Sequence, residues 1–249
     1  MKIFTSTAPV WINANPSFKY FDGRIIRYLS NQIPIAYWEY DQDLDEASSL
    51  DVALTLLHDY LKSKSQEINL IGHGTGGLLG LLYARKYPHR VKSLTLLGVG
   101  CAPAIDWQAH YYHMRKMLPC SQDTLLGRIV QMMFGKQSCA NTSNLVKILK
   151  KDLQTAPTRH SLFQIDLVRS GGVSMPMMVC GSDNDSIVDL PTLQRWSNYL
   201  KEDDLLWTTP MGHHFFHYFF PELTGRQIIK FWKGVEQTSK IMPSKLVNI

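Results

Sequence analysis

The chain has 249 residues, of which 45% are hydrophobic and 19% charged, an ordinary composition for a folded globular protein. Its net charge of +5 comes with no run of Lys and Arg, which argues against a nucleic-acid partner. No stretch approaches the roughly 18 apolar residues of a membrane span, and the first residues lack the apolar core of a signal peptide. The four cysteines are scattered, with no C-x-x-C pair. They argue against zinc or redox chemistry and fit a reducing cytoplasm.

Short apolar runs alternate with helical patterns along the chain. This alternation predicts an α/β fold, a doubly wound and mostly parallel sheet of about six strands with helices on both faces. The run 91–100 is almost continuously apolar, so we expect it at the centre of the sheet. The expected strands are residues 9–13, 35–40, 67–72, 91–100, 175–181 and 205–210.

The helices are expected where apolar residues recur at a spacing of three or four. In the stretch 48–64, Ser48 and Asp51 resemble a capping box at the helix start. A helix after residue 77 is expected to end at Pro88. The expected helices of the core are residues 19–30, 48–64, 77–88, 190–200 and 223–234.

The stretch 101–173 interrupts the alternation of strands and helices. Two amphipathic helical patterns lie within it, at residues 123–134 and 144–153. We therefore expect a helical cap, 101–173, inserted into a core formed by residues 1–100 and 174–249. No internal repeat or low-complexity linker suggests an independent domain.

A glycine-rich turn links the third expected strand to its helix, with the sequence Gly-His-Gly-Thr-Gly-Gly from Gly72 to Gly77. Strand, tight turn and helix resemble the nucleophile elbow G-x-S-x-G of the α/β-hydrolase superfamily, in its G-H-S-x-G-G form. The position of the serine is occupied by Gly74. Thr75 is out of register as a substitute nucleophile, since His73 rather than a glycine lies two residues before it. The turn does not match either phosphate-loop pattern.

The resemblance extends over residues 9–235 and implies the chain order nucleophile, acid, histidine. The stretch VCGSDNDSIVD makes Asp185 the first candidate for the acid, with Asp183 as the alternative. In GHHFF, Gly–His adjacency slightly favours His213, while the pattern G-H-F-F favours His214. His213 and His217 have the i, i+4 spacing of a metal-binding pair, but a metal site is not expected, because the Glu of the H-E-x-x-H pattern is missing between them. No cofactor is expected either.

The family's oxyanion hole uses two backbone N–H groups, one of them from the residue after the nucleophile. That residue is Thr75 here. The second comes from the loop after the first strand, where the usual His-Gly pair is replaced by Asn13 and Ala14. Asn15 occupies the donor position, and Pro16 follows without removing its N–H. Two marks of catalysis in the family are thus altered.

Without a hydroxyl at position 74 a covalent acyl intermediate cannot form there. The leading hypothesis is a non-hydrolytic relative that binds a small apolar ligand or a protein partner. Two alternatives stay open: a hydrolase of small ester- or amide-like molecules that uses His-activated water, and a lyase or cofactor-free oxygenase that uses a His–Asp base. Polar and aromatic residues alternate in the cap near the expected entrance of the pocket, although the packing of cap helices on the sheet would also account for them. The candidate pocket residues are Trp107, Tyr111, Tyr112 and His113.

Overall fold

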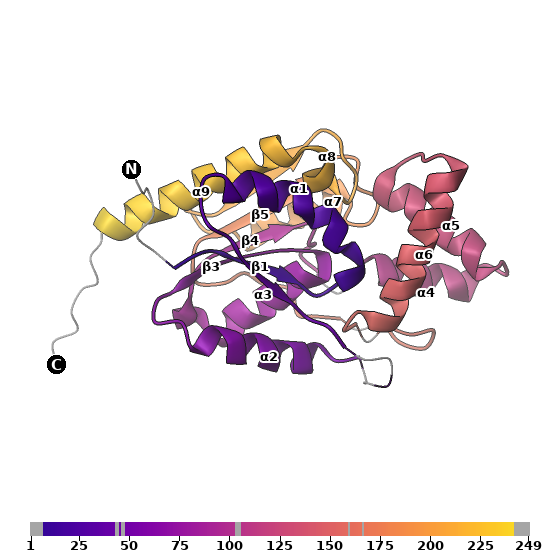
Figure 1. Ribbon diagram of the computed structural model, residues 1–249, viewed down its shortest axis with the longest axis horizontal. Coiled ribbons are helices and arrows are strands. Elements are labelled where there is room, and N and C mark those ends of the chain that lie inside the picture. Colours follow the sequence, from indigo (N-terminus) through magenta and orange to yellow (C-terminus); the bar gives the residue numbers. More distant parts are fainter. Residues whose placement is uncertain are drawn as a thin grey trace.

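The computed structural model contains one sheet of six parallel strands, which confirms the predicted doubly wound α/β fold (Figure 1). The strands lie in the order β2-β1-β3-β4-β5-β6. The structure describes residues 7–42, 45, 48–102, 106–158, 160–165 and 167–241. The strands are β1 (Val10–Asn13), β2 (Ala36–Glu39), β3 (Ile68–His73), β4 (Val91–Leu97), β5 (Met177–Ser182) and β6 (Leu205–Thr209).

Helices cover both faces of the sheet. Helices α1 (Lys19–Ser30) and α9 (Pro221–Ile241) pack together on one face, and α2 (Leu50–Lys62) and α3 (Gly74–Lys86) lie on the other (Figure 1). Side chains alternate between the two faces, as a pleated strand requires. In β1, for example, Ile12 belongs to the core beneath α3, whereas Trp11 belongs to the core beneath α1 and α9.

The start of α2 differs from the predicted capping box. Ser49, not Ser48, is the N-cap residue, and its hydroxyl accepts a hydrogen bond from the N–H of Val52. Ser48 instead donates its hydroxyl hydrogen to the carbonyl of Ala156, 3.1 Å away. Adjacent serines both satisfy the local pattern, and a partner distant in the sequence decides between them.

Three helices lie between β4 and β5, in the stretch predicted as a cap. They are α4 (Trp107–Met117), α5 (Gln122–Phe134) and α6 (Cys139–Thr155). They pack against one another at one end of the sheet (Figure 1). We call residues 101–173 the cap. The sequence patterns indicated α5 and α6 but did not assign a helix to α4.

The remaining helices are short. Only the first half of the stretch 190–200 is α-helical, as α7 (Leu190–Gln194), and a 3₁₀ turn, η3 (Arg195–Asn198), follows it. A short helix not expected from the sequence, α8 (Phe216–Phe219), precedes α9, and two further 3₁₀ turns are η1 (Pro16–Phe18) and η2 (Pro88–Arg90). Within the part of the chain that the structure describes, no helix is long and apolar enough to cross a membrane.

The strand order changes direction between β1 and β3. From β1 the chain moves outward to β2 and then returns to place β3 on the other side of β1. In open α/β sheets, such a switch point leaves a crevice at the carboxyl ends of the two strands, where ligands bind. The ends of β1 and β3 are Asn13 and His73, so the fold brings the altered first loop and the glycine-rich turn together.

Candidate functional site

Different physical constraints act on the glycines of the turn. A Cβ on Gly72 would lie 2.6 Å from the backbone carbon of Gly76, and one on Gly76 would collide with the carbonyl of Ile12. Strand and helix therefore approach too closely for side chains at those positions. Gly74 is different: its φ is +51°, and the nearest atom to a Cβ there is His214 Nε2, 3.9 Å away. The site has room for a side chain that the sequence does not supply.

His214 and Asp185 form a buried pair beside this space. Nδ1 of His214 lies 2.9 Å from Oδ2 of Asp185, and both residues are at least 95% buried. The other carboxylate oxygen of Asp185 accepts hydrogen bonds from the N–H groups of Ile187 (2.7 Å) and Val188 (3.2 Å). Asp183 is exposed instead. Because a carboxylate only accepts, the pair assigns the proton to Nδ1 and leaves the Nε2 lone pair directed at Gly74.

His213, which the sequence slightly favours over His214, does not contact Asp185. Its N–H donates to Oδ1 of Asn184 (2.9 Å), and its ring packs against Gly135 at the end of α5. Two consecutive residues with positive φ, Gly212 (+123°) and His213 (+51°), turn the chain here. This turn shifts the register by one residue and brings the ring of His214 into the site.

The loop between β6 and α8, which carries His213 and His214, is also bound to the cap. The N–H of His214 donates to the carbonyl of Met133 in α5, 3.1 Å away. His213 on the neighbouring position contacts Gly135. The cap therefore contributes to the position of the His214 ring.

The loop after β1 is arranged differently from an open oxyanion hole. The N–H of Asn15 donates to the side-chain Oδ1 of Asn13, 2.8 Å away. Asn13 is held in turn by a hydrogen bond from its amide to the hydroxyl of Tyr37 (2.6 Å). The other expected donor, Thr75, is the second residue of α3, where a backbone N–H has no acceptor within the helix. One of the two expected donors is thus already engaged.

Comparison with known proteins identifies the fold and two relatives of the chain. The model of the alpha/beta hydrolase fold family matches residues 60–137. An uncharacterized protein of Nostoc sp. (strain PCC 7120 / SAG 25.82 / UTEX 2576) is 44% identical over 224 residues, 90% of each chain. An uncharacterized protein of Synechocystis sp. (strain ATCC 27184 / PCC 6803 / Kazusa) is 38% identical over 230 residues, 92% of each chain. The crystal structure of a bacterial membrane phospholipase A superposes with a TM-score of 0.68 at 14% identity, over 92% of this chain and 80% of that one.

The chain has the α/β-hydrolase fold. It forms one family with the Nostoc and Synechocystis proteins, which match it over nearly their whole length. At 14% identity the phospholipase structure shows the shared fold alone.

A second histidine–aspartate pair lies behind the first in this α/β-hydrolase fold. Nε2 of His217 is 3.2 Å from Oδ1 of Asp22, and the other oxygen of Asp22 accepts from the indole N–H of Trp11 (2.9 Å). The ring of His73 lies between the two pairs, with its centroid 4.4 Å from that of His217, and its Nε2–H donates to the carbonyl of His214 (3.0 Å). Burial, followed by the charges of His217 and His214, holds the pKa of His73 well below its usual range. His73 is therefore a neutral support beneath His214.

The sequence did not indicate Asp152, a fully buried carboxylate of α6. It accepts hydrogen bonds from the amides of Asn15 (3.1 Å to each oxygen) and Gln108 (3.2 Å) and from the indole N–H of Trp107 (3.1 Å). Burial raises its pKa to about 7, and these three donors oppose that shift. Asp152 thus joins the cap to the loop after β1. The signal that could have indicated Asp152 is its spacing of three residues from Leu149, which places both on the buried face of α6.

An aromatic layer fills the space between the cap and the carboxyl ends of the strands. Phe134 of α5 stacks on Phe215 with ring centroids 4.7 Å apart, and Phe21 lies 4.7 Å from the same ring. Phe215 also contacts His73, at 4.8 Å between centroids. Phe21 and Phe134 also line a groove between α1, α6 and α8.

The four candidate pocket residues of the cap do not form one group. Trp107 and Tyr111 are buried in the core, where Trp107 binds Asp152 and the hydroxyl of Tyr111 accepts from Gln122 (3.2 Å). Tyr112 is half-buried and His113 is exposed. The core of the cap, rather than a pocket, accounts for the first two.

His213 and His217 do not face a common ligand. The first is held by Asn184 and the second by Asp22. Among the described residues, no group of three or more His, Cys, Asp or Glu side chains is arranged to hold a metal ion.

Proposed function

We propose that this protein is a non-hydrolytic member of the α/β-hydrolase superfamily that binds a small apolar molecule. The observation that carries the proposal is the geometry at Gly74, where a His214–Asp185 pair is directed at a position without a side chain. Acyl transfer by this device requires a hydroxyl that the pair can deprotonate. A cytoplasmic location, which the unpaired cysteines suggest, is part of the proposal.

The loop after β1 gives independent support. An oxyanion hole acts through donors that are free to bind the developing charge, and the loss of one donor lowers kcat by about 10²–10³. The N–H of Asn15 is already bound to Asn13. Nucleophile and oxyanion hole are therefore altered together, as expected of a site that no longer performs acyl transfer.

The type of ligand follows from a groove beside the aromatic layer. The groove has a volume of about 300 Å³ and lies between α1 and α8 on one side and α6 on the other. Its inner wall includes Phe21 and Phe134, the same rings that pack against Phe215. A pocket of this size and lining suits a small apolar or aromatic molecule. A protein partner at the same face is the alternative occupant.

The intact pair supports a second candidate function. With Nδ1 bound to Asp185, Nε2 of His214 can act as a general base toward a water or a substrate C–H group. The chain would then be a hydrolase that uses His-activated water, or a lyase or cofactor-free oxygenase.

Turnover of short- and medium-chain p-nitrophenyl esters tests the proposal. We expect no turnover by the natural protein and measurable turnover by Gly74→Ser, whose hydroxyl would lie next to His214. Gly23→Ser is the matched control, because a Cβ at Gly23 meets nothing within 4 Å. Turnover by the natural protein that disappears in His214→Asn would contradict the proposal and favour His-activated water.

A further inference from the structure

The positive charge of the chain is concentrated in the cap. Residues 101–173 contain nine Lys and Arg but only four Asp and Glu, whereas the rest of the chain contains 17 of each. The net charge of +5 therefore belongs to the cap alone. An asymmetry of this kind produces a field that attracts an anionic partner to one end of the molecule.

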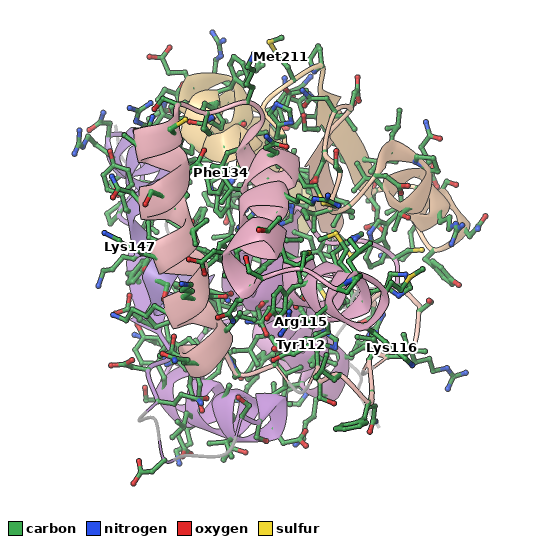
Figure 2. The ribbon with its side chains drawn as sticks, turned by 90° about the vertical axis from the view of Figure 1, so that its right-hand side faces the viewer. Tyr112, Arg115, Lys116, Phe134, Lys147 and Met211 are labelled. Carbon is green, nitrogen blue, oxygen red and sulfur yellow. The ribbon has the colours of Figure 1, made fainter. Side chains whose placement is uncertain are left out.

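The acidic residues of the cap do little to reduce this field at its surface. Asp106 and Asp152 are buried, and Asp123 pairs with Lys150 at 2.6 Å. The fourth, Asp166, lies outside the described residues. Basic side chains are exposed on all three helices of the cap and in the turn between α5 and α6; they include Arg115, Lys116, Arg128, Lys136, Lys147 and Lys151. Figure 2 views this end of the molecule, with Arg115 and Lys116 on α4 and Lys147 on α6.

Large apolar side chains are exposed in the same part of the chain. Phe163 is 95% exposed and Leu167 77%, in the segment that follows α6, and Met117 at the end of α4 is 66% exposed. In both views this segment runs along the lower side of the cap, near α4 (Figures 1 and 2). Exposed apolar groups rimmed by polar residues mark interaction sites. A phenylalanine this exposed has no packing role within the chain.

We propose that the cap docks on an anionic lipid surface. Clustered Lys and Arg bind acidic headgroups, and apolar side chains beside them insert into the boundary between headgroups and acyl chains. The cap combines both features, with Phe163 and Leu167 as the inserted groups and Arg115 and Lys116 as headgroup contacts. An acidic protein would match the charge but gives no reason for the exposed apolar side chains of Phe163 and Leu167 in the same basic part of the chain.

The contact is peripheral and depends on both components. Charge brings the cap to the surface and weakens with ionic strength, because salt screens exposed charges. The apolar side chains hold it there and make the interaction depend on lipid packing. This inference does not rest on the proposed function, since none of the residues involved lies at Gly74 or His214.

Co-sedimentation of the full chain with vesicles tests the inference. We expect binding to phosphatidylcholine vesicles that contain phosphatidylglycerol, and at least a tenfold weaker affinity for phosphatidylcholine alone. Phe163→Ser with Leu167→Ser should weaken binding to the anionic vesicles about tenfold. Their control is Val52→Ser with Leu56→Ser, a pair on α2 whose side chains are 48% and 47% exposed.

The contribution of charge to binding is tested by two double variants, one in the cap and one in α9. Arg115→Gln with Lys116→Gln should weaken binding and reduce its salt dependence, whereas Lys230→Gln with Lys233→Gln, two exposed cations of α9, should not. Insertion of the apolar side chains is measured separately with the variant Phe163→Trp. Its tryptophan fluorescence emission should shift to shorter wavelength when anionic vesicles are added. Absence of binding to anionic vesicles, or equal losses in the control pairs, overturns the inference. Binding without a fluorescence shift also overturns it and indicates a purely electrostatic contact.

Discussion

Nε2 of His214 lies 3.9 Å from the position that a Cβ on Gly74 would occupy. The same ring is held through Nδ1 by the buried carboxylate of Asp185. A base and its orienting acid are thus arranged around an empty position. Substitutions of Gly74 can therefore be used to measure separately the free energy of unfolding and the ester turnover.

Gly74→Ser should destabilise the protein by about 1–2 kcal/mol, because a residue with a Cβ is strained in the left-handed region. The φ of +51° imposes that conformation, while the surrounding space does not clash with a Cβ. The free energy of unfolding from urea titration measures the cost. Gly23→Ser, within α1, should leave stability unchanged or raise it slightly. An equal loss in both variants would show that the conformation at Gly74 is not the cause.

Asn13→Ala should raise ester turnover when combined with Gly74→Ser. Removal of the Asn13 side chain frees the N–H of Asn15, and a free oxyanion donor is worth about 10²–10³ in kcat. Steady-state kinetics of the double variant against Gly74→Ser measures the gain. Asn198→Ala, at an exposed position of η3, is the control. An unchanged kcat would mean that Asn15 does not face the developing oxyanion.

The two adjacent histidines should respond differently in the Gly74→Ser background. His214→Asn should abolish turnover, since the base that contacts Asp185 is lost. His213→Asn should retain most of it, because asparagine tolerates the positive φ and His213 is hydrogen-bonded to Asn184 rather than to Asp185. Loss of turnover in His213→Asn with folding intact would contradict the geometry.

Asp152 should make stability fall as the pH rises. Its pKa is raised to about 7 in the folded chain from 3.8, chiefly by burial. The folded state therefore holds the proton more tightly, and its contribution is complete below about pH 4 and is lost as the pH rises toward 7. The expected slope is about 1 kcal/mol per pH unit in that window. In Asp152→Asn this slope should disappear, whereas Asp123→Asn, at an exposed carboxylate of the cap, should keep it. Equal slopes in natural and Asp152→Asn protein would assign the pH dependence to other groups.

The sheet could be predicted because its signals are local. Each of the six expected strands exists within a few residues of its predicted range, and the run 91–100 contains β4, a central strand. Apolar strands and helical spacing act over neighbouring residues, so they are visible in one sequence. The glycine-rich turn is local too, since Gly72 and Gly76 approach each other across four residues.

The site was harder to predict because it depends on distant contacts. One of the partners of Asp152 is Asn15, 137 residues away, and the N–H of His214 is bound to the carbonyl of Met133. The choice between His213 and His214 is decided by two positive φ angles in one turn. None of these contacts leaves a periodic pattern in the sequence.

The hydrogen bond from His214 to Met133 couples two parts of the molecule mechanically. Met133 lies in α5, and His214, whose N–H donates to its carbonyl, also carries the ring held by Asp185. The aromatic stack of Phe134 on Phe215 acts along the same line, because it joins α5 to the residue after His214. The position of α5 and the position of the His214 ring, whose Nε2 faces Gly74, are therefore set by the same two contacts.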